Sequence, residues 1–364
     1  MRSSISHSLR SALLVLWPIL LPVAITGKAQ AQDIRLGLAV PLSGSFQLLG
    51  QQFADGARVA AEDGGIELVE VDDACSPESA EQAARAMAEA GVSMVIGFLC
   101  TPTLEAAMPI LAETGIPVLT PIRTPSLTDR RERTGWPIWR IAPRADDEAE
   151  AIARILINQW RRSHFAIVDD GTIYGRDIAE NLRAEAELAG LRPVLFDTFR
   201  PQMENQVGLV GRLRRSGATH VFVGGDRSDI AIIARDARKI YYDVVIAGGE
   251  ALRAADEAIA LPPGIRMIAA PRWEDIASRD VIQQVEDAGI VPEGYVVLGH
   301  AAVDVAAGAV RAALDDETPV EEQLRNFTFD TAIGLIRFNE KGDLAGNPYR
   351  LFIYDGTEFV EAGE

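Results

Sequence analysis

Two cysteines, Cys75 and Cys100, are the residues of this 364-residue chain whose spacing points first to chemistry. Each follows an apolar run, in the stretches VDDAC and VIGFLC, and the segment Pro77–Glu89 between them has the apolar spacing of an amphipathic helix. In a right-handed parallel crossover the two strand ends lie on the same edge of a sheet, where two Cα atoms can come within disulfide distance. Open α/β sheets bind ligands at that edge. The stretch therefore predicts a strand–helix–strand unit, a cysteine pair and a binding edge.

The N-terminal segment predicts export. Arg2 and Arg10 precede the apolar run Ala12–Thr26, and small residues follow at Ala29 and Ala31. This is the pattern of a secretory signal peptide comprising residues 1–31. The alternative, a transmembrane anchor, is disfavoured because the run is short and contains two prolines.

Export makes a disulfide the favoured state of the two cysteines, because they are an even pair in an oxidising compartment. Two buried free thiols remain the alternative. A metal site is not expected, since no histidine lies near either cysteine in the sequence. Removal of residues 1–31 removes three basic residues and no acid, so the formal net charge changes from −18 to −21. Such an acidic surface disfavours binding to nucleic acid and to anionic membranes.

The mature chain alternates predicted strands and helices in two similar sets, which predicts an α/β fold with parallel sheets covered by helices on both faces. The predicted strands are Ile34–Val40, Ile66–Val71, Val92–Ile96, Ile116–Thr120, Trp139–Ile141, Phe165–Val168, Val194–Phe196, His220–Val223, Val244–Ala247, Ile265–Ala270, Thr331–Phe338 and Tyr349–Tyr354. The predicted helices are Phe53–Glu62, Pro77–Glu89, Leu104–Glu113, Asp146–Trp160, Ile178–Ala189, Val207–Arg215, Ile230–Ile240, Val281–Ala288 and Tyr295–Leu314. Two such halves with facing strand-end loops would form a cleft.

Several motifs of the chain resemble those of the branched-chain amino acid (Leu/Ile/Val-binding) type of periplasmic solute-binding protein of ABC transporters. The motifs are LAVPLSG, DDAC, VIGFLC, TP-x-x-T at Thr120–Thr124, IYG, GGD, GGE and NEKGDLAG, and DDAC followed by GFLC is the most specific. The resemblance covers about residues 33–359 and implies a location in the periplasm. It implies the type I periplasmic binding fold, in which three crossovers join two doubly wound parallel-sheet lobes with a ligand cleft between them. It also implies a Cys75–Cys100 disulfide, with lobe 1 at about 33–142 plus 273–348 and lobe 2 at about 143–272 plus 349–364.

The resemblance implies that Thr101, Thr124 and Ile122 bind the charged groups of an amino acid. Thr101 follows the second cysteine at the start of a predicted helix, where unpaired backbone N–H groups and a hydroxyl can hold a carboxylate. The alternative for Thr101 is an ordinary helix cap, and the two roles can coexist. Thr124 would bind the same carboxylate through its hydroxyl and N–H, and the backbone carbonyl of Ile122 would bind the ammonium.

The resemblance implies three further ligand-binding residues. Tyr174 matches a lobe-2 tyrosine that meets the ligand on closure, and its alternative is a core aromatic. Glu250 matches an acid that pairs with the ligand ammonium, and such an acid selects for amines because a desolvated ion pair needs both charges. The alternative for Glu250 is a solvated loop acid. Tyr295 matches an aromatic residue near the side-chain pocket.

Three positions depart from the branched-chain pattern. Leu49 and Asp226 stand where aromatic residues are usual, and Arg123 stands where a small residue is usual. We include Asp226 among the expected ligand-binding residues. Because an unpaired buried charge is costly, Asp226 and Arg123 must face solvent, pair with each other or pair with the ligand. The departures favour a ligand more polar than leucine.

The function expected from these residues is that of an extracytoplasmic solute-binding component of an ABC uptake system, which binds an amino acid or amino-acid-like molecule between two closing lobes. Its partner would be an inner-membrane ABC permease, and a monomer is expected. The alternative is a ligand-sensing protein for a short amide, a carboxylate or an aromatic acid. An enzyme is not expected, because G-x-S-x-G, H-E-x-x-H and Walker A sequences are absent. No catalytic residue, cofactor or metal is therefore predicted.

Overall fold

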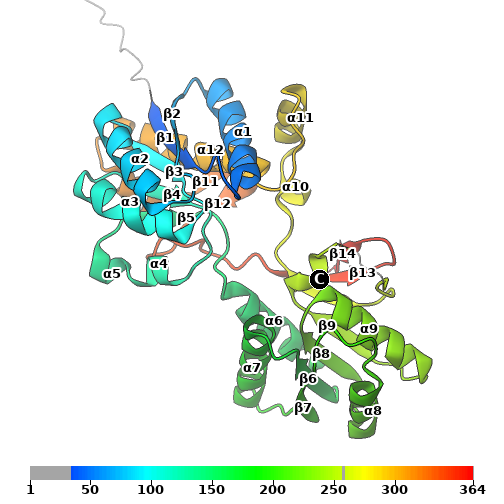
Figure 1. Cartoon of the computed structure of the whole chain (residues 1–364). Coiled ribbons are helices and arrows are strands. Elements are labelled where there is room, and N and C mark those ends of the chain that lie inside the picture. Colours follow the sequence, from blue (N-terminus) through cyan, green and yellow to red (C-terminus); the bar gives the residue numbers. More distant parts are fainter. Residues whose placement is uncertain (1–33, 256–258, 364) are drawn as a thin grey trace, which may run out of the picture. The chain divides into compact units, whose positions relative to one another are not determined.

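The computed structural model describes residues 34–255 and 259–363, which contain two largely parallel sheets covered by helices (Figure 1). The signal peptide predicted at residues 1–31 lies outside the described residues. Strand and helix alternate along most of the chain. This order gives the α/β layers that the sequence predicts, because each crossover helix covers one face of a sheet.

The first sheet has five parallel strands in the order β2-β1-β3-β4-β5. The strands are β1 (Arg35–Val40), β2 (Glu67–Asp72), β3 (Met94–Gly97), β4 (Val118–Thr120) and β5 (Ile138–Arg140), and the covering helices are α1 (Gln47–Gly64), α2 (Pro77–Ala90), α3 (Thr101–Glu113) and α12 (Val296–Asp316). Helices α1 and α12 pack on one face around Phe53 and Leu38. Helices α2 and α3 pack on the other face around Met87 and Leu104. The loops after β2, β3 and β4 therefore meet at one edge of the sheet.

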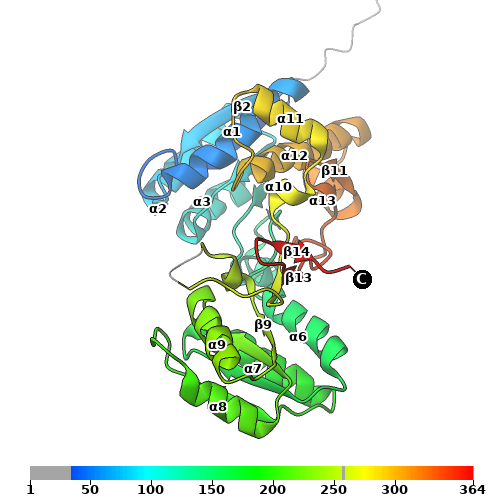
Figure 2. The same cartoon turned by 90° about the vertical axis from the view of Figure 1, so that its right-hand side faces the viewer.

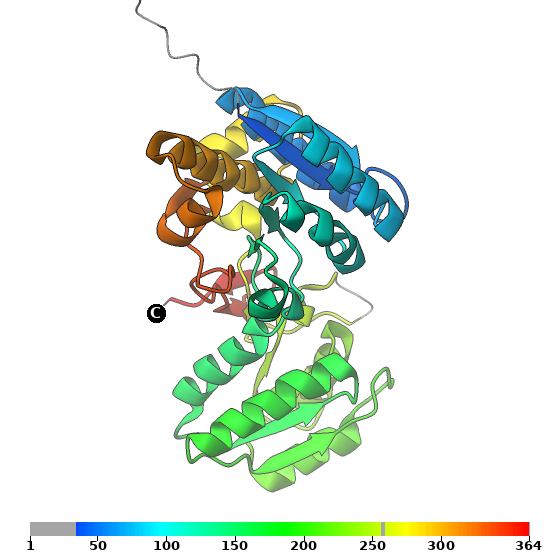
Figure 3. The same ribbon diagram turned by 90° about the vertical axis from the view of Figure 1, so that its left-hand side faces the viewer.

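The second sheet has the order β14-β13-β10-β9-β8-β6-β7. Its strands are β6 (Phe165–Asp169), β7 (Leu195–Thr198), β8 (His220–Gly224), β9 (Val245–Gly248), β10 (Arg266–Ala269), β13 (Arg350–Tyr354) and β14 (Phe359–Glu361), and its helices are α6 (Asp147–Trp160), α7 (Ile173–Leu188), α8 (Val207–Ser216) and α9 (Arg227–Lys239). Helices α8 and α9 pack on one face (Figure 2). Helices α6 and α7 pack on the other (Figure 3). Strands β6 to β10 are parallel, whereas β13 and β14 add an antiparallel edge.

The chain passes between the two sheets three times within the described residues. The passages lie between β5 and α6, between β10 and α10 (Trp273–Ile276), and between β12 (Gly334–Ile336) and β13. Helices α10, α11 (Arg279–Asp287) and α13 (Val320–Asn326) belong to the first core, since Trp273, Val281 and Leu324 pack there. The predicted fold class, two doubly wound sheets joined by three crossovers, is confirmed.

Helix α12 is the one described helix whose length and apolar composition would suffice to cross a membrane. Most of its apolar window, 78%, is buried inside the protein. Its backbone approaches that of α1 closely: a Cβ at Gly56 would lie 1.7 Å from the Val296 carbonyl oxygen, and a Cβ at Gly299 would lie 2.0 Å from that of Phe53. The apolar character of α12 therefore reflects its place in the core.

One predicted strand, Thr331–Phe338, is wrong. The structure has a hairpin there, with β11 (Phe329–Thr331) antiparallel to β12. The chain turns because Gly334 adopts a φ of 92°, which favours glycine, and because the Thr331 hydroxyl donates to the Gly334 carbonyl at 2.7 Å. The short elements α4 (Ser126–Asp129), α5 (Arg131–Thr134), the 3₁₀ helix η1 (Glu250–Arg253) and β14 were not predicted.

Several helices begin earlier than predicted, and the differences are largest in α1 and α7. Helix α1 begins at Gln47 and not at Phe53, and α7 begins at Ile173 and not at Ile178. In α7 the Thr172 hydroxyl accepts a hydrogen bond from the Gly175 N–H at 3.0 Å and caps the helix. Tyr174 therefore lies in the first turn of α7.

Candidate functional site

A disulfide joins Cys75 and Cys100 at the edge of the first sheet, with their Cα atoms 5.6 Å apart. Ala74 and Cys75 have positive φ angles of 46° and 50°. The side chains of Asp72 and Asp73 stabilise this turn by accepting hydrogen bonds from the N–H groups of Ala74 and Cys75, at 2.8 and 2.9 Å. The disulfide predicted from export and from the family resemblance is confirmed.

Thr101 and Thr124 come together next to this disulfide. Thr101 is the first residue of α3, and its Oγ1 lies 2.8 Å from Oγ1 of Thr124. Among the described residues, the backbone N–H groups of Leu99, Cys100, Thr101 and Thr124 have no hydrogen-bond partner. Two hydroxyls and several unpaired N–H groups at a helix N-terminus form a suitable cradle for a carboxylate. We name these four residues the carboxylate cradle.

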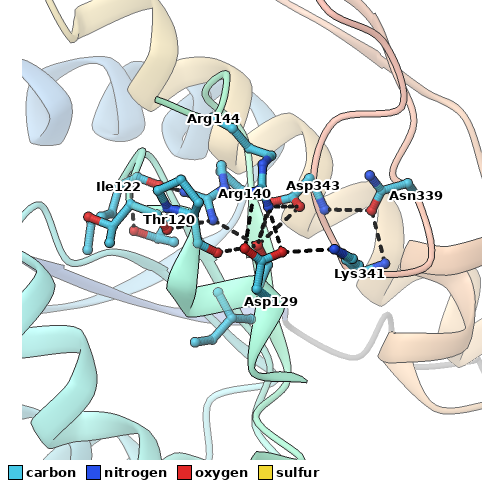
Figure 4. A network of polar contacts seen from close by, with 12 residues as sticks. Thr120, Ile122, Asp129, Arg140, Arg144, Asn339, Lys341 and Asp343 are labelled. Atoms are coloured by element: carbon cyan, nitrogen blue, oxygen red, sulfur yellow. Dashed lines mark hydrogen bonds and ion pairs between the residues drawn. The ribbon is translucent and has the colours of Figure 1, made fainter. Parts of the chain in front are cut away.

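Arg140 holds the loop after β4, which includes Ile122 (Figure 4) and Thr124. Its side chain is 0% exposed, and its Nε lies 2.7 Å from Asp343 Oδ1. The same guanidinium donates to the backbone carbonyls of Ile122 and, at 3.0 Å, Thr124. The Ile122 N–H in turn donates to the Thr120 hydroxyl at 3.1 Å. Both backbone groups of Ile122 therefore have partners within the protein, and the predicted Ile122–ammonium contact would have to share its carbonyl with Arg140.

The same network extends to the first passage between the sheets. Arg144 lies 3.1 Å from Asp343 Oδ2 and 3.2 Å from Asp129 Oδ1, and Lys341 lies 2.8 Å from Asp129 (Figure 4). Hydrogen bonds from Arg144 and then from Lys341 lower the pKa of Asp129 to about 2. These ion pairs connect the segment after β5 with the loop that precedes the third passage.

Glu250, the acid predicted to bind an ammonium group, has partners within the protein. Arg123 Nη1 lies 2.8 Å from Glu250 Oε1, and the Tyr349 hydroxyl donates to Oε2 at 2.8 Å. Arg123 also donates to the Tyr349 hydroxyl. Burial lowers the pKa of Arg123, but the charge of Glu250 and its hydrogen bond to Arg123 contribute to raising it overall. The sequence predicted that Arg123 would face solvent, pair with Asp226 or pair with the ligand. Its ion pair with Glu250 was therefore not predicted.

Glu148 is a second acid of this region, and sequence reasoning missed it. Its Oε1 accepts hydrogen bonds from the Tyr174 hydroxyl at 2.8 Å and from the Glu250 N–H at 2.7 Å. Burial, followed by the charge of Glu250, raises the pKa of Glu148 to about 7. Burial and the neighbouring Glu148 raise the pKa of Tyr174 as well. Glu148 follows Asp146 and Asp147 in the acidic run DDE at the start of α6.

A cavity of about 470 Å³ opens beside these residues. Arg123, Glu250 and Tyr295 line it, together with Arg253 and Trp273. No partner within the described residues binds the Tyr295 hydroxyl, so it is free to contact a ligand. Of the predicted site residues, the structure therefore brings Glu250 and Tyr295 to one cavity, with Arg123 between Glu250 and the carboxylate cradle.

Asp226 and Leu49 lie outside the lining of this cavity. Asp226 caps α9, since its Oδ1 accepts from the Asp229 N–H and the Ser228 hydroxyl, both at 2.9 Å. It therefore has a structural role, and Arg123 pairs with Glu250 instead of with Asp226. Leu49 is half-buried in α1. In the part of the chain that the structure describes, no group of His, Cys, Asp and Glu side chains could hold a metal ion.

Two helix-covered sheets, three passages between them and polar groups gathered where the passages begin define a two-lobed α/β binding protein. The family model described as "Periplasmic binding protein" matches residues 33–358. The chain therefore belongs to the periplasmic binding protein family, as its motifs predict. Membership of this substrate-binding family places the protein outside the cytoplasm.

Sequence identity to individual relatives is low. The chain is 28% identical over 345 residues to Leu/Ile/Val-binding protein homolog 3 of Brucella melitensis, which covers 90% of this chain and 93% of the relative. Among solved structures it resembles an ABC transporter substrate-binding protein from Desulfitobacterium hafniense in complex with Leu, with 21% identity, a TM-score of 0.64 and 91% and 100% of the two chains covered. It also resembles a solute-binding protein from R. palustris in complex with benzoate, with 18% identity, a TM-score of 0.59 and 91% and 96% covered. The structural likenesses support the fold.

Proposed function

We propose that this chain is the solute-binding component of an ABC uptake system and that it binds an amino acid or amino-acid-like molecule. One observation carries the proposal: the carboxylate cradle and the acid Glu250 are linked through a single residue. Arg123 directly precedes Thr124 in the chain and reaches Glu250 at 2.8 Å. An amino acid presents a carboxylate and an ammonium group a few ångströms apart, which matches a cradle of donors beside an acid.

We propose further that ligand binding closes two lobes, at about 33–142 plus 273–348 and about 143–272 plus 349–364. Thr101, Thr124 and Tyr295 would act from lobe 1, and Tyr174 and Glu250 from lobe 2. A ligand that contacts both lobes favours the closed state by its differential contacts. The Leu/Ile/Val-binding relative and the leucine complex support this ligand class.

The remaining expectations stay part of the proposal. Residues 1–31 would direct the protein to the periplasm, where the mature chain would act as a monomer with an inner-membrane permease. We do not propose an enzyme activity, because no nucleophile, base and orienting group come together at the cavity described above. Asp226 and the Ile122 carbonyl are weaker members of the proposed site, since each has a partner within the protein.

Isothermal titration calorimetry with the twenty amino acids, their amides and simple organic acids tests the proposal. A binding amino acid should lose about 100-fold or more in affinity in Glu250→Ala, because a buried ammonium loses its charge partner. Thr101→Val should weaken every carboxylate ligand, whereas Glu150→Gln, an exposed acid on α6, is the control. Tight amino-acid binding by Glu250→Ala would refute the assignment of Glu250.

A carboxylate without an amine is a second candidate ligand. Because Arg123 already pairs with Glu250, a carboxylate without an amine could occupy the cradle and leave that ion pair intact. The benzoate complex of a structural relative shows that this fold accommodates such a ligand. Binding of benzoate but of none of the amino acids would favour this alternative.

A further inference from the structure

Glu148, in the first turn of α6, is a buried acid to which the proposed function assigns no role. Its side chain is 3% exposed. Its Oε1 accepts hydrogen bonds from the Tyr174 hydroxyl and from the Glu250 N–H, at 2.8 and 2.7 Å. Its Oε2 has no hydrogen-bond partner among the described residues. Since both donors belong to proposed ligand-binding residues, Glu148 is fixed directly against the site.

The backbone beside Glu148 leaves just enough space for this arrangement. A Cβ at Gly249 would lie 2.3 Å from Glu148 Oε1 and 2.5 Å from the Tyr174 hydroxyl oxygen. Such distances are shorter than any allowed contact, so a side chain at this position would displace the acid. The second glycine of the GGE motif therefore allows Glu148 to approach Glu250.

The charges around Glu148 do not balance. The groups that face it are Glu250 from η1, Tyr174 from α7 and Arg123 from the loop after β4, with Tyr349 beyond Arg123. Both tyrosines stay neutral because burial raises their pKa. Arg123 is the cation that acts on Glu148, whereas Arg253, which lines the same cavity, acts on Glu250. Among the described residues no arginine or lysine forms an ion pair with Glu148 itself, so a positive charge beside Glu148 is missing when both acids are ionised. Burial of an unbalanced charge is unfavourable, so either a proton or another cation must supply it.

We propose that Glu148 is a second acid of the ligand site and that the ammonium group of the ligand supplies the positive charge that Arg123 alone does not. The inference rests on the proposed function, because an amino acid brings that ammonium. Without ligand, a proton on Glu148 balances the site. When the ligand enters as an ammonium ion, this proton leaves to the solvent. Glu148 acts through Glu250, so it is a positioning residue that makes binding depend on pH.

The sign of the pH dependence follows from the site. The ligand favours the ionised form of Glu148, whose pKa without ligand is about 7. Below pH 7 the ligand must displace a proton, so the dissociation constant should rise about tenfold for each pH unit. Above pH 7 the acid is already ionised and the dissociation constant should be constant.

Calorimetry with L-leucine, L-isoleucine and L-glutamate at pH 6, 7 and 8 tests this, in pairs of buffers that differ in ionisation enthalpy. The wild type should release about 0.9 proton per ligand at pH 6, about 0.5 at pH 7 and about 0.1 at pH 8. Glu148→Gln keeps an acceptor for Tyr174 and Glu250 but carries no proton that can leave. It should release none and bind with a pH-independent constant, and Glu150→Gln on the same helix should behave as the wild type.

A ligand-free measurement does not depend on the ligand chosen. Burial raises the pKa of Asp73 and of Asp229 to about 6, so these two carboxyl groups titrate in the wild type and in Glu148→Gln alike. Infrared difference spectra between pH 5 and 9 should show one further carboxyl group titrating near pH 7 in the wild type and not in the variant. Its absence between pH 6 and 8 would overturn the inference. Amino-acid binding without proton release would also overturn it and leave the proposed function standing, whereas failure of all twenty amino acids and their amides to bind would refute both.

Discussion

Replacement of Arg140 by methionine tests whether the buried ion pair holds the segment that carries Thr124. Arg140 is 0% exposed, and it donates to Asp343, to the hydroxyl of Thr128 and to the carbonyls of Ile122 and Thr124. Methionine fills much of the same volume but removes every donor. The two carbonyls and the buried carboxylate then lose their partner.

The expected cost can be worked out in two ways. Each carbonyl left without a donor lowers the free energy of unfolding by about 1–3 kcal/mol, so the two carbonyls together lower it by about 2–6 kcal/mol. Removal of one partner of a buried ion pair costs about 3–5 kcal/mol. Asp343 keeps Arg144 at 3.1 Å, which limits the second figure. We therefore expect Arg140→Met to lower the free energy of unfolding by about 3–5 kcal/mol.

Urea unfolding, followed by both fluorescence and circular dichroism, measures this difference. The matched control is Arg85→Met, because Arg85 forms an exposed ion pair with Glu81 on α2 and such pairs contribute about 0–1 kcal/mol. At a temperature where the variant stays folded, ligand affinity should fall as well, since Thr124 moves. A cost below about 1 kcal/mol for Arg140→Met, equal to that of the control, would refute the reasoning.

Three further outcomes are expected. Cys75→Ser should lower the free energy of unfolding by about 3–4 kcal/mol relative to the oxidised wild type, and dithiothreitol should give the same loss in the wild type alone. Asp129 has a lowered pKa of about 2 when folded, so its contribution to stability is present above its ordinary pKa of 3.8 and should disappear as pH falls from about 4 to about 2, but not in Asp129→Asn. Glu148 has a raised pKa of about 7 against an ordinary value of 4.5, so the folded state loses stability as pH rises through that interval. Glu148→Gln should accordingly be more stable than the wild type at pH 8 by up to about 3 kcal/mol and equal to it near pH 4, as pH-dependent thermal unfolding would show.

Local pattern predicted much of the fold. The apolar runs located every strand of the two large sheets except β14, because a strand covered by helices on both faces must be apolar throughout. The helix Pro77–Ala90 was predicted to within one residue, since Ser76 caps it and Gly91 ends it. The hairpin at β11 and β12 was missed because its two short strands lie in one apolar run. The strand–helix–strand order also indicated that Cys75 and Cys100 would meet at one edge.

The site was predicted in part. The sequence and the family resemblance indicated Thr101, Thr124 and Glu250, and the structure places the two threonine hydroxyls together and Glu250 at the cavity. Glu148 was missed, although the DDE run could have prompted a question about which acid of three points inward. Every third or fourth residue of a helix faces the core, and Glu148 shares that face with Ile152.

The sequence by itself determined the strand and helix pattern, the export signal that makes a disulfide favourable, and the residue types of the carboxylate cradle. Tertiary structure alone decided the partners of the charged groups. It pairs Arg140 with Asp343 across 203 residues and Arg123 with Glu250 across 127, and it brings the Glu250 N–H to the Glu148 carboxylate across 102. The physical reason is that periodicity records whether a residue is buried, which neighbours in the chain reveal. Periodicity does not record which charged group a buried residue meets, because that depends on how the loops at the ends of different strands are brought together.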